Sequence, residues 1–405
     1  MPECEVRPLA ESEFRAAHDV FATSLQAPQP ISAERWQRSA QRYEVGRAFG
    51  AYLGGELSGT AMSMSSSLVV PGGAVLPAAA VTGVGVRADR TRRGLLRELM
   101  RAQLADLRRR GEPVAMLHAS ETPIYPRFGY GVATRSQRVA LRTSRAAMRP
   151  EAPGDGEVRL VDGGTAEKLL PALYAGLPGR PGMIARTEGW WRTRLADTAE
   201  HGGGQLVAVR TGPDGQDDGF AVYEPDKADH VFGDGSCTVK VLDLQAAGPA
   251  AEAALWRFLL RLDLVTEVVA ADRPVDEALP WWLHDARACR IDRVDDDLWV
   301  RLVDVPRALA ARGYGPGEPV VLEVRDPVLP ENSGSYRVGP DGAAPCAEPG
   351  QLVLDADVLG ALYLGDVLVS TLAAANRVQV RDEAAVERAD RLFASVRPPW
   401  CGTPF

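Results

Sequence analysis

The stretch Ala80-Val81-Thr82-Gly83-Val84-Gly85-Val86, followed directly by Arg87-Ala88-Asp89-Arg90-Thr91-Arg92-Arg93-Gly94, decides the fold of the first third of the chain. The apolar stretch predicts a strand, and the basic segment predicts a turn that opens a helix. Apolar residues then recur at helical spacing: Leu95, Leu96, Leu99, Met100, Leu104 and Leu107. The next apolar run, 114–119, predicts a second strand. Strand, helix and strand in this order imply a right-handed crossover and parallel pairing.

The turn before the helix has the features of an anion site. Backbone N–H groups at a helix N-terminus carry the positive end of the helix dipole, and Gly94 lets that backbone approach a ligand closely. Arg92 and Arg93 add positive charge at the same place. The pattern therefore predicts a pyrophosphate-binding turn. An ordinary basic helix start on a solvated face is the alternative explanation.

The rest of the chain divides into further modules. At about 100–200 residues per domain, 405 residues predict two to four domains. A run from 133 to 141 is expected to close the first module, and the Pro- and Gly-rich segment 148–157 reads as a linker. The second module repeats the order of the first, with strands at 205–210, 220–223 and 238–244, a helix at 249–262 and a strand at 267–271. Its turn after Leu244 has no arginine, so it is expected to lack the cofactor site.

A third module begins near Leu298. Its predicted strands are 320–324 and 352–354, and its predicted helices start at 305 and cover 357–363, 371–376 and 383–394. Prolines in the last ten residues predict an extended tail.

Composition restricts the class of protein. The 45% apolar and 25% charged residues match an average globular protein, and the net charge of −8 argues against nucleic-acid binding. No stretch reaches the ~18–20 apolar residues of a membrane span, and the acidic N-terminus is unlike a signal peptide. We therefore expect a cytoplasmic protein without a membrane partner. Five scattered cysteines, with no paired-ligand spacing, predict no disulfide and no metal site.

Three motifs carry a resemblance to a known family. They are Arg92-Arg93-Gly94-Leu95-Leu96-Arg97, Leu117-His118-Ala119-Ser120-Glu121 and Ile124-Tyr125-Pro126-Arg127-Phe128-Gly129-Tyr130-Gly131. The first resembles the Q/R-x-x-G-x-G/A turn of the GNAT superfamily of N-acetyltransferases, from which it departs at Thr91 and Leu96. Together at this spacing, the three look specifically like the enhanced intracellular survival (Eis) family.

The resemblance covers the whole chain and implies its architecture. The implied fold class is α/β (α+β), with tandem GNAT-like domains followed by a sterol-carrier-protein-like domain. The boundaries that follow are 1–147 for the acetyl-CoA-binding domain, 148–297 for a second GNAT-like domain without a cofactor site, and 298–405 for the third domain, whose C-terminal tail enters the active site. Eis-family proteins form hexamers, so a homohexamer is implied.

The family's functional residues map onto named positions of this chain. Acetyl-CoA, the implied co-substrate, is expected at Val84, Gly85, Val86, Arg92, Arg93, Gly94, Leu95 and Ser120. Tyr125 becomes the general acid, because a phenol with a free pKa of about 10 can protonate a departing thiolate at modest cost. In the alternative explanation Tyr125 and Tyr130 are both aromatic residues that merely pack beside a turn.

The implied base is a terminal carboxylate on Phe405. Its free pKa of about 3.5 lies far below the 10.4 of an alkylammonium, so direct proton transfer would be uphill by about 9 kcal/mol. It is therefore expected to act on an amine that is already partly neutral, or through water. A frayed tail is the usual alternative for a terminus.

The residues expected to contact the acceptor amine are Gln26, Trp36, Gly83, Asp296 and Pro404. His118 reads as a structural group. The predicted function is acetyl transfer to a primary amine of a small molecule that is aminoglycoside-, polyamine- or lysine-like, by direct attack. The alternatives are a dedicated acetyltransferase of a secondary metabolite or peptide amine, and a non-enzymatic lipid or small-molecule binder that uses the third module.

Overall fold

The structure is a computed structural model that describes residues 4–27, 30–196, 204–226 and 237–405. The chain divides into two compact units. Unit 1 comprises residues 1–134, 180–185 and 297–405, and unit 2 comprises residues 135–179 and 186–296. Among the described residues, no helix combines the length and the apolar character that crossing a bilayer requires.

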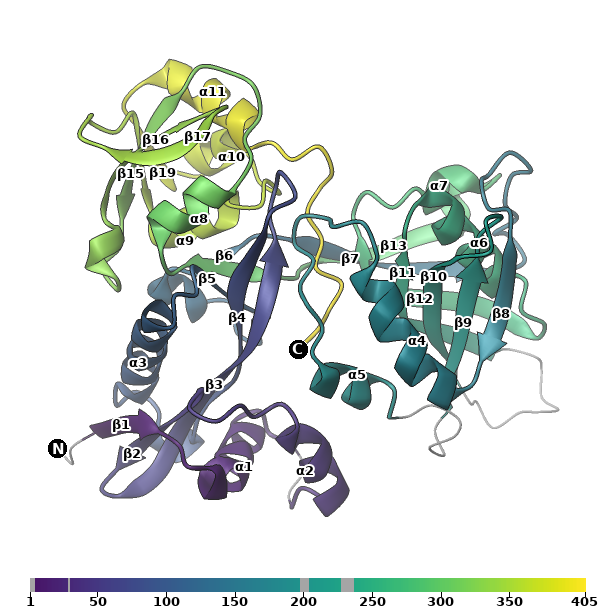
Figure 1. Ribbon diagram of the computed structural model, residues 1–405, viewed down its shortest axis with the longest axis horizontal. Coiled ribbons are helices and arrows are strands. Elements are labelled where there is room, and N and C mark those ends of the chain that lie inside the picture. The colour runs from purple at the N-terminus through teal and green to yellow at the C-terminus, as the bar shows by residue number, and fades with distance from the viewer. Residues whose placement is uncertain (1–3, 28–29, 197–203, 227–236) are drawn as a thin grey trace. The chain divides into compact units, whose positions relative to one another are not determined.

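The first sheet of unit 1 has seven strands in the order β1-β2-β3-β4-β5-β14-β6. They are Cys4–Pro8, Ala48–Leu53, Glu56–Val69, Val75–Val86, Val114–Leu117, Trp299–Leu302 and Gly131–Val132. β3 and β4 form a long antiparallel hairpin, and β4 pairs with β5 in parallel, as predicted (Figure 1). The helices are α1 (Phe14–Ser24), α2 (Ala33–Ala40) and α3 (Leu95–Arg109).

Helix α3 confirms the periodicity seen in the sequence. Leu95, Leu99, Met100, Leu104 and Leu107 are all buried, so one face of the helix packs into the core. Burying such a set of apolar side chains stabilises the fold by about 1.5–3 kcal/mol for each fully buried leucine or methionine. Packing of this face holds α3 against the sheet, so its first turn, at Leu95, lies close to the end of β4 at Val86.

Unit 2 holds the second sheet, in the order β13-β7-β12-β11-β10-β9-β8. The strands are Cys289–Asp296, Arg135–Arg142, Val265–Pro274, Cys237–Ala246, Asp217–Pro225, Leu206–Thr211 and Glu157–Val161. The helices are α4 (Gly163–Ala175), α5 (Glu188–Arg194), α6 (Pro249–Leu260) and α7 (Leu279–Trp282). The predicted strands and helix of the second module are all present.

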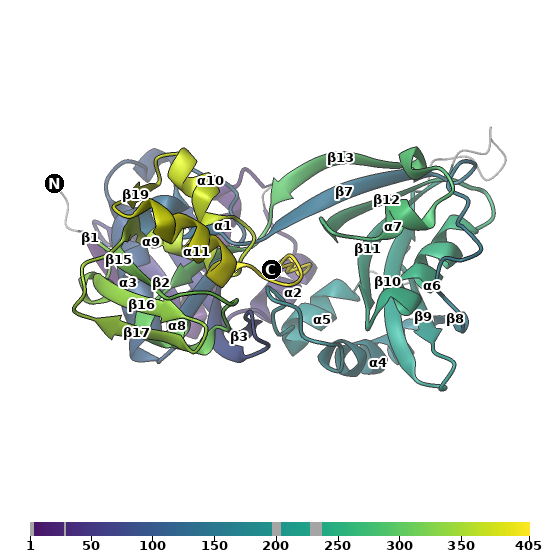
Figure 2. The ribbon, with the colours of Figure 1, turned by 90° about the horizontal axis from the view of Figure 1, so that it is seen from above.

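One strand assignment was wrong. The run 133–141, expected to close the first module, contains β7, which pairs with β12 and β13 of the second sheet (Figure 2). β14, just after the boundary expected at 297, instead joins the first sheet between β5 and β6. Segment 133–141 and β14 are both apolar enough to form buried strands. Only long-range pairing decides which sheet each strand joins, and this pairing is not visible in the local sequence. The boundaries at 147 and 297 remain predictions.

The third sheet, also in unit 1, has the order β17-β16-β15-β18-β19. The strands are Gly342–Cys346, Gly334–Gly339, Val320–Arg325, Leu352–Asp355 and Val378–Val380, and the helices are α8 (Val305–Ala311), α9 (Ala356–Leu362), α10 (Val369–Ala374) and α11 (Glu383–Phe393). The predicted helices and two strands are confirmed, while β16, β17 and β19 were not anticipated.

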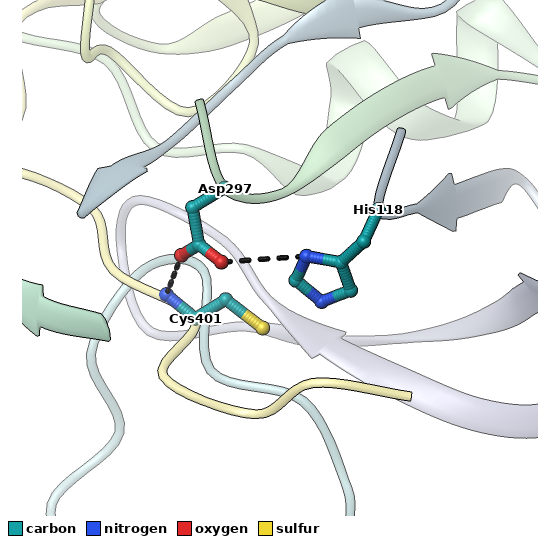
Figure 3. Close-up of side chains that lie close together, drawn as sticks. All are labelled: His118, Asp297 and Cys401. Carbon is teal, nitrogen blue, oxygen red and sulfur yellow. Dashed lines mark hydrogen bonds and ion pairs between the residues drawn. The ribbon is translucent and has the colours of Figure 1, made fainter. Parts of the chain in front are cut away.

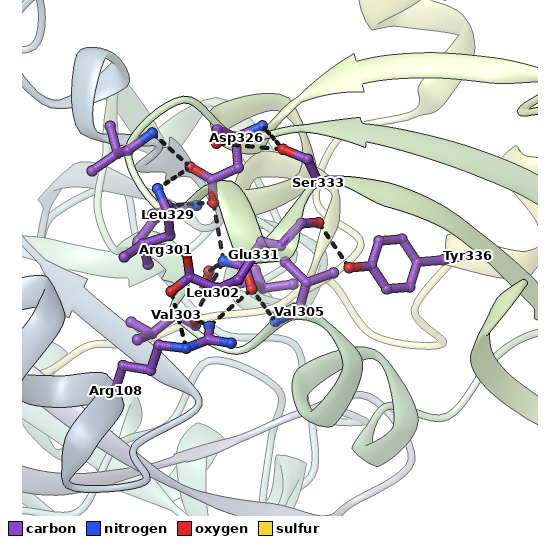
Figure 4. Close-up of polar contacts among 12 residues, drawn as sticks. Arg108, Arg301, Leu302, Val303, Val305, Asp326, Leu329, Glu331, Ser333 and Tyr336 are labelled. Carbon is purple, nitrogen blue, oxygen red and sulfur yellow. Dashed lines mark hydrogen bonds and ion pairs between the residues drawn. The ribbon is translucent and has the colours of Figure 1, made fainter.

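A buried polar network ties the third module to β14 (Figure 4). Arg301 Nη2 donates to Asp326 Oδ2 at 2.6 Å, and neither side chain is exposed. Asn332 Nδ2 donates to the same carboxylate at 3.0 Å and to the Val303 carbonyl at 3.2 Å. The first and third sheets of unit 1 are therefore linked by hydrogen bonds between buried polar groups as well as by apolar contact.

Candidate active site

The end of β4 separates from its neighbour β5. The two strands pair only from Ala78 with Val114 to Ala80 with Met116, although β4 continues to Val86. On its other side, β4 has one more residue than β3 between two paired positions. Thr60 faces Gly85, whereas Met62 faces Thr82. This β-bulge places Gly83 at φ +61°, a conformation that favours glycine. The backbone edge of Val81–Val86 that faces β5 is thus available to an extended ligand.

The basic turn brings backbone N–H groups to the same place. Gly94 is the N-cap of α3 at φ +85°, and Arg92 adopts φ +61°. Such a left-handed conformation is uncommon for a residue with a side chain and is associated with functional turns. The first N–H groups of α3 have no partner within the helix and carry the positive end of its dipole. The turn therefore has the geometry of an anion site.

A cavity of about 780 Å³ lies between these elements. Its lining includes eight predicted cofactor-site or catalytic residues: Val84, Gly85, Val86, Arg92, Gly94, Leu95, Ser120 and Tyr125. Arg93 does not belong to the lining. Ser24 closes one side, where a β-carbon on Gly85 would lie 2.3 Å from the Ser24 hydroxyl oxygen. The cavity is large enough for an extended cofactor arm and has backbone, arginine and phenol groups along it.

Tyr125 lies at the start of a short 3₁₀ turn, Tyr125–Phe128, and is 6% exposed. Burial raises the pKa of its phenol, and the Glu121 carboxylate raises it further. The ring packs edge-on against Tyr130, with centroids 6.1 Å apart. Tyr130 is completely buried, and burial also raises its pKa. Of the two rings, only Tyr125 lines the cavity, and its role as general acid stays a prediction.

The C-terminal tail after α11 contains no helix, as the prolines predicted, and it is packed against the protein rather than frayed. Trp400, Cys401 and Thr403 are all at least nine-tenths buried. The Trp400 N–H donates to the Pro181 carbonyl at 2.8 Å, and Arg180 Nε donates to the Pro398 carbonyl at 2.8 Å. Phe405 is half-buried and packs edge-on against His118, with ring centroids 4.7 Å apart.

His118 and Asp297, neither of them predicted as a site residue, lie beside this tail (Figure 3). His118 Nδ1 is 3.4 Å from Asp297 Oδ1, and His118 Nε2 is 3.1 Å from the Thr403 carbonyl oxygen. His118 follows β5 and Asp297 precedes β14, and these strands are antiparallel neighbours in register. The pairing of β14 with β5 therefore brings the two residues together. Local patterns in the sequence did not predict this pairing.

The residues expected to contact the acceptor come from different elements. Gln26 follows α1 at φ +57°. Trp36 packs against His18, with ring centroids 5.4 Å apart. Asp296 ends β13 in unit 2, and Pro404 is exposed. Neither these four nor Gly83 belongs to the cavity lining.

Comparisons with known proteins agree with this geometry. Residues 5–133 and 182–302 each match the acetyltransferase (GNAT) domain, and residues 305–402 match the sterol carrier protein domain. An uncharacterized N-acetyltransferase of Streptomyces avermitilis is 40% identical over 410 residues, covering 98% of both chains. N-acetyltransferase Eis of Mycobacterium tuberculosis is 39% identical over 365 residues, covering 86% of both chains.

The chain belongs to the Eis family of N-acetyltransferases. The crystal structure of Eis1 from Mycobacterium abscessus agrees, with a TM-score of 0.89, 37% identity and full coverage of both chains. The predicted Eis architecture, two acetyltransferase domains followed by a sterol carrier domain, is confirmed. The protein is accordingly an acetyltransferase enzyme.

Proposed function

We propose that this Eis-family enzyme transfers an acetyl group from acetyl-CoA to a primary amine of a small molecule, and that acetyl-CoA binds in the cavity beside β4. The observation that carries the proposal is the coincidence of a free strand edge, a helix N-terminus and a buried phenol in one cavity of about 780 Å³. The amides of the pantetheine arm can extend the sheet along Val84–Val86, as a strand would.

The pyrophosphate would lie at the N-terminus of α3. Backbone N–H groups at Gly94 and Leu95, together with the Arg92 guanidinium, suit a doubly charged anion. Arg90, which also lines the cavity, already pairs with Glu56 at 3.0 Å. Arg93 lies outside the lining, so its role rests on the family resemblance, as does that of Ser120 as a contact to the pantetheine arm.

Tyr125 would act as the general acid that protonates the departing thiolate. Because burial raises the pKa of its phenol, the proton is retained at neutral pH until the thiolate forms. A carboxylate on Phe405 would act as the base, through water or on an amine that is already partly neutral. Its placement is supported by the burial of the tail that leads to it. Transfer would be direct, without an acyl-enzyme.

The second acetyltransferase domain would not bind the cofactor. Its parallel strands β11 and β12 pair from Cys237 to Val241, and beyond that pairing Arg273 Nη1 donates to the Leu244 carbonyl at 2.7 Å. Arg273 is buried and paired with Glu277 at 2.6 Å. This side chain occupies the interval that stays open in the first domain. Titration with acetyl-CoA should therefore give one site per chain.

The acceptor is proposed to be an aminoglycoside-, polyamine- or lysine-like amine, with one secondary metabolite or peptide amine as the narrower alternative. The uncharged Gln26 and Gly83 favour that alternative, because neither offers a carboxylate to a polycation. A homohexamer is proposed on the family resemblance alone. The alternative of a non-enzymatic lipid or small-molecule binder is disfavoured, because Tyr363 and Arg312 are both buried and Arg312 Nε donates to the Tyr363 carbonyl at 2.7 Å.

The test is a thiol-release assay with acetyl-CoA across polyamines, aminoglycosides and lysine peptides, with product masses measured in parallel. Amine-dependent thiol release with a mass increase of one acetyl group supports the proposal. Acetyl-CoA binding without release for any amine would exclude amine acetylation. Broad release favours a general amine acetyltransferase, and release with one compound favours the dedicated enzyme.

A further inference from the structure

The buried C-terminal tail makes hydrogen-bond contacts with His118 and Asp297, two side chains that have no role in the proposed reaction. The Thr403 carbonyl lies 3.1 Å from His118 Nε2, and the Cys401 N–H lies 3.4 Å from Asp297 Oδ2. We propose that His118 and Asp297 form a docking site that positions the C-terminal tail for acetyl transfer. The inference rests on the proposed function, because it assigns these residues to placement of the carboxylate proposed on Phe405.

Asp297 is held so that its carboxylate has one orientation. It is 7% exposed, and the Thr134 hydroxyl donates to Oδ2 at 3.0 Å. The same hydroxyl oxygen accepts the Leu298 N–H at 2.9 Å, and the Asp297 N–H donates to the Thr134 carbonyl at 3.0 Å. Since a buried carboxylate is costly unless its oxygens are satisfied, this arrangement fixes where Oδ1 points. It points at His118 (Figure 3).

His118 lies between two groups that only accept hydrogen bonds. The Asp297 carboxylate faces Nδ1 and the Thr403 carbonyl faces Nε2. Each ring nitrogen that carries a proton can donate to the acceptor that faces it. The imidazole therefore lies between the fixed carboxylate and the tail and contacts both. Its edge-on contact with Phe405 extends the same site to the last residue.

Docking at Thr403 limits where the end of the tail can go. A residue spans at most about 3.5 Å, so the two residues after Thr403 keep the carboxylate proposed on Phe405 within about 7 Å of the docked carbonyl. Pro404 restricts this path further, because its φ is fixed. Holding a reacting group in place raises its effective concentration. His118 and Asp297 are thus positioning residues that act through the tail.

A metal ion is the competing explanation for the same cluster. His118, Asp297 and Cys401 each offer one possible ligand atom, and these three atoms lie within 4.8 Å of one another. Histidine, carboxylate and cysteine are all ligands that zinc accepts. The hydrogen bonds described above satisfy the carboxylate without a metal. The two explanations differ in the role of the Cys401 thiol, which only the metal requires.

The experiment measures docking of the tail independently of activity. Cys401 is 1% exposed, so its rate of maleimide labelling, followed by peptide mass spectrometry, reports release of the tail. Cys289 is 8% exposed in unit 2 and reports global unfolding in the same sample. The variants are His118→Ala, His118→Gln, His118→Asn and Asp297→Asn, and His284→Ala, at an exposed position of unit 2, is the control.

Labelling of Cys401 should rise at least tenfold in His118→Ala and Asp297→Asn, with Cys289 unchanged. Turnover should fall at least tenfold with KM for acetyl-CoA unaltered. His118→Gln, whose amide can still donate to the Thr403 carbonyl, should recover more than His118→Asn, whose shorter amide cannot reach it. His284→Ala should match the unmodified protein in both measurements.

The inference is overturned if Cys401 stays protected in both His118→Ala and Asp297→Asn, or if a chelator or Cys401→Ser lowers turnover as much as His118→Ala does. Faster labelling with unchanged turnover would establish docking but remove its role in the reaction, and with it the proposed carboxylate base. Failure of the unmodified enzyme to acetylate any amine would count against the proposed function alone, because the labelling result does not depend on activity.

Discussion

Replacing Asp326 by alanine should destabilise unit 1 severely. Asp326 and Arg301 are both completely buried, with Arg301 Nη2 2.6 Å from Asp326 Oδ2. Removing the carboxylate leaves an uncompensated buried guanidinium, which typically costs about 3–5 kcal/mol. It also removes the acceptor of the Leu329 N–H at 2.9 Å (Figure 4). At roughly 2–4 °C per kcal/mol for a domain of this size, the melting temperature should fall by about 6–20 °C.

Thermal unfolding followed by circular dichroism measures this shift. The matched control is Glu348→Ala, since Glu348 pairs with Arg337 on the surface at 3.2 Å and about half of each side chain is exposed. Such a pair contributes about 0–1 kcal/mol, so the control should change little. A double replacement, Arg301→Met with Asp326→Leu, should recover most of the stability because no charge stays unpaired. If Asp326→Ala costs no more than Glu348→Ala, the argument about buried charge is refuted.

Three further predictions concern the cofactor turn, the tail and alkaline stability. Gly94→Val should weaken acetyl-CoA binding at least tenfold in isothermal titration, because a branched side chain at φ +85° distorts the anion turn; unchanged binding would place the pyrophosphate elsewhere. Residues appended after Phe405 should reduce turnover severely while melting temperature and acetyl-CoA affinity stay constant; full activity would exclude the carboxylate as base. Burial raises the pKa of Tyr336 to about 12, above the ~10 of an unfolded tyrosine, so its stabilisation is complete below pH 10 and declines toward pH 12. The free energy of unfolding should decline less over that range in Tyr336→Phe, and an equal decline would contradict the shift.

The elements that line the cavity beside β4 could be predicted because their signals are local. Helix α3 is visible as a helical repeat of leucines, and its N-cap as a glycine that follows arginines. β14 could not be placed in the same way. Trp299 pairs with Leu117, far away in the chain, and an apolar run alone does not reveal which sheet it joins. Fold class was therefore more predictable than strand membership.

In the candidate site, too, residues in a local motif could be predicted, whereas residues brought together by long-range strand pairing could not. Tyr125 was proposed as a site residue from its motif, and it lines the cavity. His118 was interpreted as a structural group, because a single histidine has no partner in the sequence. Of the acidic residues before β14, Asp296 was chosen, but Asp297 is the one that contacts His118. Neighbouring residues in an extended segment point in opposite directions, so the Asp297 side chain is buried while that of Asp296 is exposed. The pairing of β5 with β14 was the missing information.

The most direct test of acetyl transfer in this cavity compares the unmodified enzyme with Tyr125→Phe at saturating acetyl-CoA and amine. Tyr125 lines the cavity and is buried, so the replacement keeps the ring and removes only the proton donor. The account predicts that kcat for amine-dependent thiol release falls by about 10²- to 10⁴-fold, while the Kd of acetyl-CoA changes less than twofold. Tyr130→Phe, in the adjacent ring that does not line the cavity, should leave kcat nearly unchanged. An unchanged kcat in Tyr125→Phe would contradict the account.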